Sequence, residues 1–190
     1  MAQPSSASVF VGKPKVGGAI FSAPADTTAP TDATTALGAA FVNLGYATQE
    51  GLTNSIETNY ESITAWGGDE VLKALTSRAE TFKWGFLQTE ADVLKEVYGT
   101  ANVTVGEGGA LTVIHNGQDA GKRIYVFDIL LTEGKVLRHV VPLGQITEVG
   151  DVVYKDGDPI SYEVTLSCYP DSTGNTAYTY IAQTVANPET

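Results

Sequence analysis

The feature that most constrains this fold is an abrupt change of hydrophobic period within residues 79–99. In residues 79–87 large side chains alternate with small or polar ones, so Phe82, Trp84 and Phe86 share one face of a predicted β-strand. From residue 89 to residue 98 the apolar side chains recur at helical spacing, which predicts a short amphipathic helix. Because a helix of about nine residues is marginal alone in water, it must pack on an apolar surface.

The ends of this helix and the core that it joins are also readable from the sequence. Thr89 is the predicted N-cap, acidic residues follow in the first turn, and Gly99 is placed to end the helix in the left-handed conformation. The predicted core of the strand and helix comprises Phe82, Trp84, Phe86, Leu94, Val97 and Tyr98. We expect further strands to add Tyr125, Phe127, Tyr162, Val164 and Leu166 to it.

Most of the remaining chain has the patterns of β-strands. Residues 160–168 alternate strictly, as in a half-buried antiparallel strand, whereas residues 122–131 are apolar on both faces and predict a central strand covered on both sides. Residues 37–48 predict another strand, and Pro142 indicates an edge position or a bulge. The predicted fold class is mainly β: an antiparallel β-sandwich or barrel with one flanking short α-helix at about residues 89–98, long loops and an N-terminal arm.

Length and charge limit the organisation and the partners. The 190 residues suit an N-terminal arm, residues 1–14, followed by a single domain, residues 15–190. With 11 basic and 22 acidic residues the net charge is −11, which argues against a surface for DNA, RNA or anionic lipid. No apolar run approaches the roughly 18 residues of a membrane span, and residues 1–14 lack the pattern of a secretory signal, so we expect no membrane insertion.

The residues that usually carry chemistry are few and scattered. The two histidines, His115 and His139, are not accompanied by a cysteine cluster, so we expect no transition-metal site. Cys168 falls on the apolar face of its strand, which predicts a buried and inert thiol. The sequence therefore predicts no catalytic residues, no cofactor and no enzyme activity, and it favours a structural or binding role.

Four stretches together resemble a known family over about half of the chain. They are residues 15–24, residues 60–68, the run RAETFKWGFLQTEADVLKEVYG at residues 78–99 and the run DPISYEVTLSCYPD at residues 158–171. In residue type, spacing and order they resemble the tail tube (major tail) proteins of long-tailed bacteriophages. The tube proteins of type VI secretion and other contractile injection systems share that family's fold. The immunoglobulin-like C-terminal domain that some such proteins carry is not expected here.

The resemblance implies a structural virion protein of the phage tail, made in the host cytoplasm. Its subunits would close into homo-hexameric rings stacked as a hollow tube, through which DNA is ejected without specific binding. The tape measure protein and the tail terminator and tip proteins would be its other partners. We also expect an acidic or neutral bore, with most lysines and arginines paired between subunits or on the outside. A simpler alternative is that the negative charge only keeps the soluble precursor from aggregating.

Three segments have too few apolar residues for their length: residues 1–14, 23–36 and 47–69. We expect them to contact other subunits rather than their own core, although a flexible linker fits residues 23–36 equally well. The predicted subunit contacts are Val9, Phe10, Val11, Lys13, Lys15, Tyr60, Trp66, Lys122, Arg123 and Arg138. Two other functions stay open: a carbohydrate-binding or adhesion module that uses Tyr60 and Trp66, and an enzyme on a β-scaffold.

Overall fold

The computed structural model describes residues 9–15, 18–118 and 120–183. One α-helix, α1 (Ala91–Tyr98), is accompanied by three single 3-10 turns, η2 (Thr100–Asn102), η3 (Glu107–Gly109) and η4 (Thr132–Gly134). The strands are β1 (Gly12–Pro14), β2 (Ile20–Pro24), β3 (Val42–Asn43), β4 (Thr53–Thr64), β5 (Glu70–Phe86), β6 (Val103–Val105), β7 (Leu111–Val113), β8 (Arg123–Leu131), β9 (Lys135–Val149), β10 (Tyr162–Cys168) and β11 (Tyr178–Gln183).

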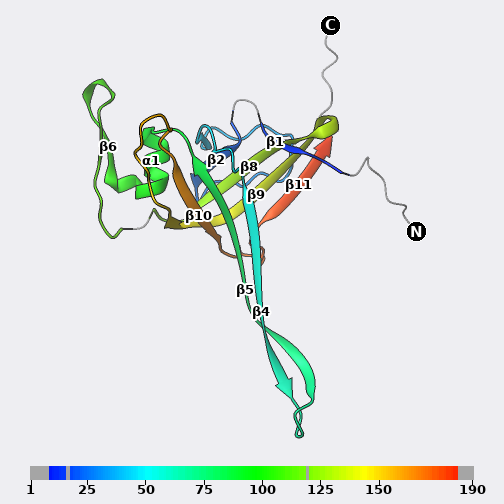
Figure 1. Cartoon of the computed structure of the whole chain (residues 1–190). Coiled ribbons are helices and arrows are strands. Elements are labelled where there is room, and N and C mark those ends of the chain that lie inside the picture. The colour runs from blue at the N-terminus through cyan, green and yellow to red at the C-terminus, as the bar shows by residue number, and fades with distance from the viewer. Residues whose placement is uncertain (1–8, 16–17, 119, 184–190) are drawn as a thin grey trace.

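Nine of the strands form one antiparallel sheet in the order β3-β2-β8-β9-β10-β5-β4, with β1 pairing β8 and β11 pairing β9 (Figure 1). Strands β6 and β7 form a separate two-stranded sheet. The prediction of a mainly β, antiparallel fold with one short helix is confirmed. Among the described residues the outer strands β3 and β4 do not pair with each other, so the sheet curls around its core without closing into a barrel.

The main core lies inside this curl. Trp84 on β5 meets Phe127 on β8 with ring centroids 5.1 Å apart, although β9 and β10 lie between these strands in the sheet. Helix α1 adds the buried side chains of Val93, Leu94 and Val97 to the same cluster. Because burying one large apolar side chain is worth about 1.5–3 kcal/mol, this aromatic cluster holds the curl together.

Strand β8 is buried on both faces, as its sequence predicts. Tyr125 and Phe127 face the main core. Ile124 and Val126 belong to a second cluster, with Ala23 and Val140 buried beside them. Partly buried apolar residues of the segment between β2 and β3, including Leu37 and Phe41, pack against this second cluster.

Two expectations about that segment need correction. Part of residues 23–36 packs on the sheet of its own chain, since Ala23 is buried in the second cluster and Ala29 packs against it, whereas most of the range is exposed and its contact with other subunits stays a prediction. The strand expected over residues 37–48 is reduced to β3, since Leu37 and Phe41 turn onto the second cluster instead of alternating between two faces.

The helix ends and Pro142 also differ from expectation. Helix α1 starts at Ala91 with Glu90 as N-cap, because the Thr89 hydroxyl lies 3.2 Å from the Tyr162 hydroxyl instead. Gly99 ends the helix at φ 92° and ψ 141°, a positive φ outside the left-handed helical region.

Pro142 is not on an edge, because β9 lies between β8 on one side and β10 and β11 on the other. It stands between the β9 residues paired with β11 and those paired with β10. In this stretch the four residues 141–144 of β9 lie opposite only the three residues 123–125 of β8, so β9 carries one extra residue. The predicted bulge is confirmed.

Candidate assembly surface

The hairpin of β4 and β5 extends well beyond the rest of the sheet (Figure 1). Residues 80–86 of β5 pair with β10, and residues 80–83 pair with β4 as well, whereas residues 70–79 pair only with β4. All twelve residues of β4 are exposed, and Ala74 is the only one of the first ten residues of β5 that is not. At about 3.4 Å per residue, residues 57–64 span about 27 Å beyond the body.

The free part of the hairpin is unusually apolar for a solvated element. Its exposed large side chains are Tyr60, Ile63, Trp66, Val71, Leu72 and Leu75. Tyr60 lies opposite Leu75, and Ile63 lies opposite Leu72, so apolar cross-strand pairs face water. An isolated two-stranded hairpin is marginally stable in water, and exposed apolar patches mark interaction sites. This surface is therefore suited to a protein partner.

The tip of the hairpin is a tight turn that presents Trp66 to solvent. The Ala65 amide donates to the Asp69 carbonyl at 2.8 Å, and Gly67 and Gly68 adopt φ values of 119° and 96° that favour glycine. Trp66 is fully exposed. Asp69 is exposed too, and its carboxylate has no ion-pair partner within the described residues.

A cavity of about 620 Å³ opens at the other end of β4. Its walls come from β1, from residues 47–52 and from the open end of the main core, and they include Lys13, Ile20, Leu52, Trp84, Phe127 and Ile129. The buried indole nitrogen of Trp84 has no hydrogen-bond partner in the described chain. The hairpin therefore links an apolar projection at its tip to an apolar cavity at its base.

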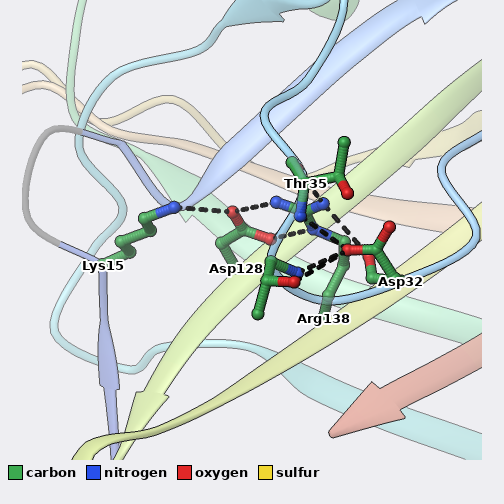
Figure 2. Close-up of polar contacts among 6 residues, drawn as sticks. Lys15, Asp32, Thr35, Asp128 and Arg138 are labelled. Atoms are coloured by element: carbon green, nitrogen blue, oxygen red, sulfur yellow. Dashed lines mark hydrogen bonds and ion pairs between the residues drawn. The ribbon is translucent and has the colours of Figure 1, made fainter. Parts of the chain in front are cut away.

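A buried polar cluster joins β8 and β9 to residues 32–35 and to Lys15 (Figure 2). Arg138 on β9 donates to Asp128 on β8 through two nitrogens, at 2.6 and 2.8 Å, and both side chains are 1% exposed. Arg138 also donates to the carbonyls of Asp32 and Thr35, and the Lys15 ammonium lies 3.3 Å from Asp128. Hydrogen bonds from Thr35 and Thr34 hold the pKa of the Asp32 carboxyl below its usual range.

The position of Arg138 contradicts its prediction as a subunit contact. Its guanidinium is enclosed by Asp128 and by the backbone of residues 32–35, so it has no surface to offer a second copy. Arg123 is also largely withdrawn from solvent, because its Nε lies 2.9 Å from the carboxylate of Glu96, a buried residue of α1.

Most basic residues already have an acidic partner within the single chain, so few are left for the predicted pairing between subunits, while their predicted position on the outside of a tube stays a prediction. All 11 lie in the described part of the chain, and nine form ion pairs within it. The two others are Lys122, whose ammonium lies 4.4 Å from the Tyr169 ring centroid, and Lys13, which is exposed at the cavity. Lys13 is thus the one cation of the described chain with neither an acidic nor an aromatic partner.

The remaining predicted contacts lie on the N-terminal segment and on the hairpin. Val9 and Val11 are exposed, while the Phe10 ring lies under the Lys135 ammonium at 4.1 Å. Residues 12–14 of the predicted arm pair with β8 of their own chain, and residues 1–8 lie outside the described residues. Tyr60 and Trp66 are both on the free hairpin.

The second strand of the hairpin also belongs to this surface, although none of its residues is among the predicted contacts. Val71, Leu72 and Leu75 on β5 are exposed. A usable signal was present: two β-like runs of similar length flank the Gly67-Gly68-Asp69 turn. Cys168 is buried as predicted, and burial raises the pKa of its thiol to about 12.

Within the described residues, no group of three or more histidine, cysteine or acidic side chains is placed to hold a metal ion. No helix in this part of the chain is long and apolar enough to cross a membrane.

Comparison with known proteins gives one family. A family model described as "Phage tail tube protein" matches residues 11–190. No curated protein gives a significant sequence match.

Among solved structures, the chain is similar to one from the sheath-tube complex of the extracellular contractile injection system PVC. The identity is 9% and the TM-score 0.47, covering 90% of this chain and 93% of that one. It is also similar to a chain of the anti-feeding prophage cap, at 13% identity and a TM-score of 0.44, again covering 90% and 93%. A chain of the native gene transfer agent virion is 11% identical with a TM-score of 0.38, covering 77% and 92%. At these values the family assignment rests on the sequence match alone.

Proposed function

This chain belongs to the phage tail tube protein family, a family of structural tail proteins, and we propose that it assembles into homo-hexameric rings stacked as a hollow tube. DNA passes through the bore of this tube without specific binding. Other partners are the tape measure protein and the tail terminator and tip proteins. The protein resides in the virion tail after synthesis in the host cytoplasm, and it acts without a cofactor or an enzymatic activity.

The free β4–β5 hairpin is the observation that carries this proposal. It exposes six large apolar side chains on an element that no described part of its own chain covers. A tip that binds a different surface of the next copy makes a head-to-tail contact, which propagates into rings or filaments. Burial of the hairpin in such contacts removes its apolar surface from water and orders the free strands.

The charge distribution supports a wall that does not hold DNA. A hexamer would carry a formal charge of −66, six times the −11 of one chain. Since nine of the 11 cations are already paired within the chain, few remain to bind phosphates by counterion release. An acidic or neutral bore repels DNA over about 8 Å at physiological salt, which keeps it away from the wall.

The test is to concentrate the purified protein and examine it by sedimentation and negative-stain electron microscopy. We expect rings or tubes for the natural chain. A variant in which an Asn-Gly turn replaces residues 57–79 keeps the Ile56↔Glu80 pair and should remain a folded monomer. A natural chain that stays monomeric at every concentration, and instead binds glycans through Tyr60 and Trp66, would refute the tube and favour a carbohydrate-binding module.

A further inference from the structure

We infer that the hairpin tip of one copy docks into the cavity at the base of β4 in a second copy, with Trp66 entering the cavity and Asp69 pairing with Lys13. This inference rests on the proposed tube function and deepens it, because it assigns the contact that joins successive copies along the tube.

The projection has the properties of a binding anchor. Trp66 is fully exposed at the far end of the hairpin, where the Gly67-Gly68 turn leaves open space around the backbone. Tryptophan is the side chain most enriched among the residues that dominate protein interfaces, and such residues fill pockets on the partner. Nothing in the described part of its own chain covers this ring.

The cavity has a matching size and lining. Its volume of about 620 Å³ lies in the range of about 300–1,000 Å³ that encloses drug-sized ligands, so an indole and part of a turn fit inside. Ile20, Leu52 and Phe127 supply apolar walls. An aromatic ring in such a cavity would lose most of its contact with water.

Charge orients the two surfaces. Asp69, three residues after Trp66, has no ion pair within the described chain, whereas the neighbouring Glu70 is held by Ser62 and Lys73. At the cavity, Lys13 is likewise unpaired. Glu50 is the other charged residue that lines the cavity. Hydrogen bonds from its own backbone and from Thr48 lower the pKa of its carboxyl. Docking thus brings together an unpaired acid and an unpaired cation.

The positions along β4 make the contact head to tail. Leu52, in the cavity wall, directly precedes the first residue of β4, and Trp66 lies two residues beyond the last. Figure 1 shows this strand running from the body to the distal tip. Twelve strand residues span about 40 Å, so copies joined in this way repeat along the tube axis at about 40 Å or less.

The test compares the critical concentration for tube formation by sedimentation, with the products examined by electron microscopy. Trp66→Ala, Asp69→Lys and Lys13→Glu should each raise the critical concentration about tenfold or more. Lys13→Glu combined with Asp69→Lys should restore it to within a few-fold of the natural protein. The matched control is Asp156→Lys, the same charge change in an exposed turn, which should leave assembly unchanged.

The outcomes separate this inference from the proposed function. If Trp66→Ala and both charge reversals form tubes as readily as the natural chain, the docking contact is wrong although the tube stands. Failure of the double reversal to restore assembly would likewise overturn the Asp69–Lys13 pairing. Residues 1–8 are the other candidate occupant of the cavity. Loss of tubes on deleting them, with tubes retained by Trp66→Ala, would assign the cavity to that segment instead. If the natural chain never polymerises, the proposed function itself fails.

Discussion

Arg138 and Asp128 form a buried ion pair between adjacent strands, with Nε 2.6 Å from Oδ1 and both side chains 1% exposed. Because the same guanidinium donates to the carbonyls of Asp32 and Thr35, the pair also fixes the segment between β2 and β3 on the sheet. One arginine thus holds together β8, β9 and the long loop between β2 and β3, which has few large apolar residues.

Removing one member of this pair should be costly. Arg138→Met leaves the Asp128 carboxylate buried beside only the half-exposed Lys15, so we expect unfolding free energy to fall by about 3–5 kcal/mol. The double variant Arg138→Met with Asp128→Leu should be more stable than Arg138→Met alone, because no uncompensated charge remains. Urea unfolding of dispersed subunits measures both, and a loss under about 1 kcal/mol in the single variant would contradict this description of the cluster.

Trp84 should be the most sensitive side chain of the main core. It touches Phe86, Tyr125 and Phe127, with ring centroids 5.1–6.0 Å apart, and is 2% exposed. We expect Trp84→Ala to destabilise the subunit by about 3–5 kcal/mol, and Trp84→Phe by clearly less. Since the Trp84 indole nitrogen has no partner in the described chain, the phenylalanine variant loses no hydrogen bond. Equal losses in the two variants, measured by urea unfolding, would exclude this account.

Gly85 holds the cavity wall close to β5. Its carbonyl accepts the Thr48 amide at 2.8 Å, and a Cβ at residue 85 would lie 2.6 Å from Thr48 Cγ2. We therefore expect Gly85→Ala to cost about 1–3 kcal/mol through this clash. Adding Thr48→Ala should recover part of the loss, because it removes the clashing atoms. Additive losses in the double variant would show that the clash is not the cause.

The Cys168 thiol should be inert in the folded chain. Burial, with a smaller contribution from Glu80, raises its pKa to about 12, so the reactive thiolate is scarce at pH 8. We expect a thiol reagent to label the folded protein far more slowly than the protein in denaturant, where the pKa returns to its ordinary value. Similar labelling rates with and without denaturant at pH 8 would mean that Cys168 is accessible.

The sequence predicted the local elements better than their arrangement. The alternation of Phe82, Trp84 and Phe86 correctly placed three side chains that are at most 2% exposed, since a two-residue period leaves one face for the core. Arg138 was predicted as a subunit contact because of its charge, and charge alone does not reveal that Asp128 on the adjacent strand and two loop carbonyls bind it within the chain.

The free hairpin was only partly predictable, for a physical reason. Tyr60 and Trp66 were predicted as subunit contacts and are exposed in the single chain, but the alternation of a strand does not say which neighbour covers its apolar face. Leu72 and Leu75 look like core residues in the sequence and face solvent in the single chain. We propose that other copies cover this apolar pattern in the assembled tube.

A three-dimensional reconstruction of the polymer by cryo-electron microscopy tests the central claim most directly, namely that this chain builds a tube by head-to-tail contacts of its hairpin. We predict six-fold rings repeating at about 40 Å or less, with Trp66 and the apolar side chains of β4 and β5 buried against other copies. A polymer without a closed ring, or one whose hairpins remain in solvent, would contradict the account.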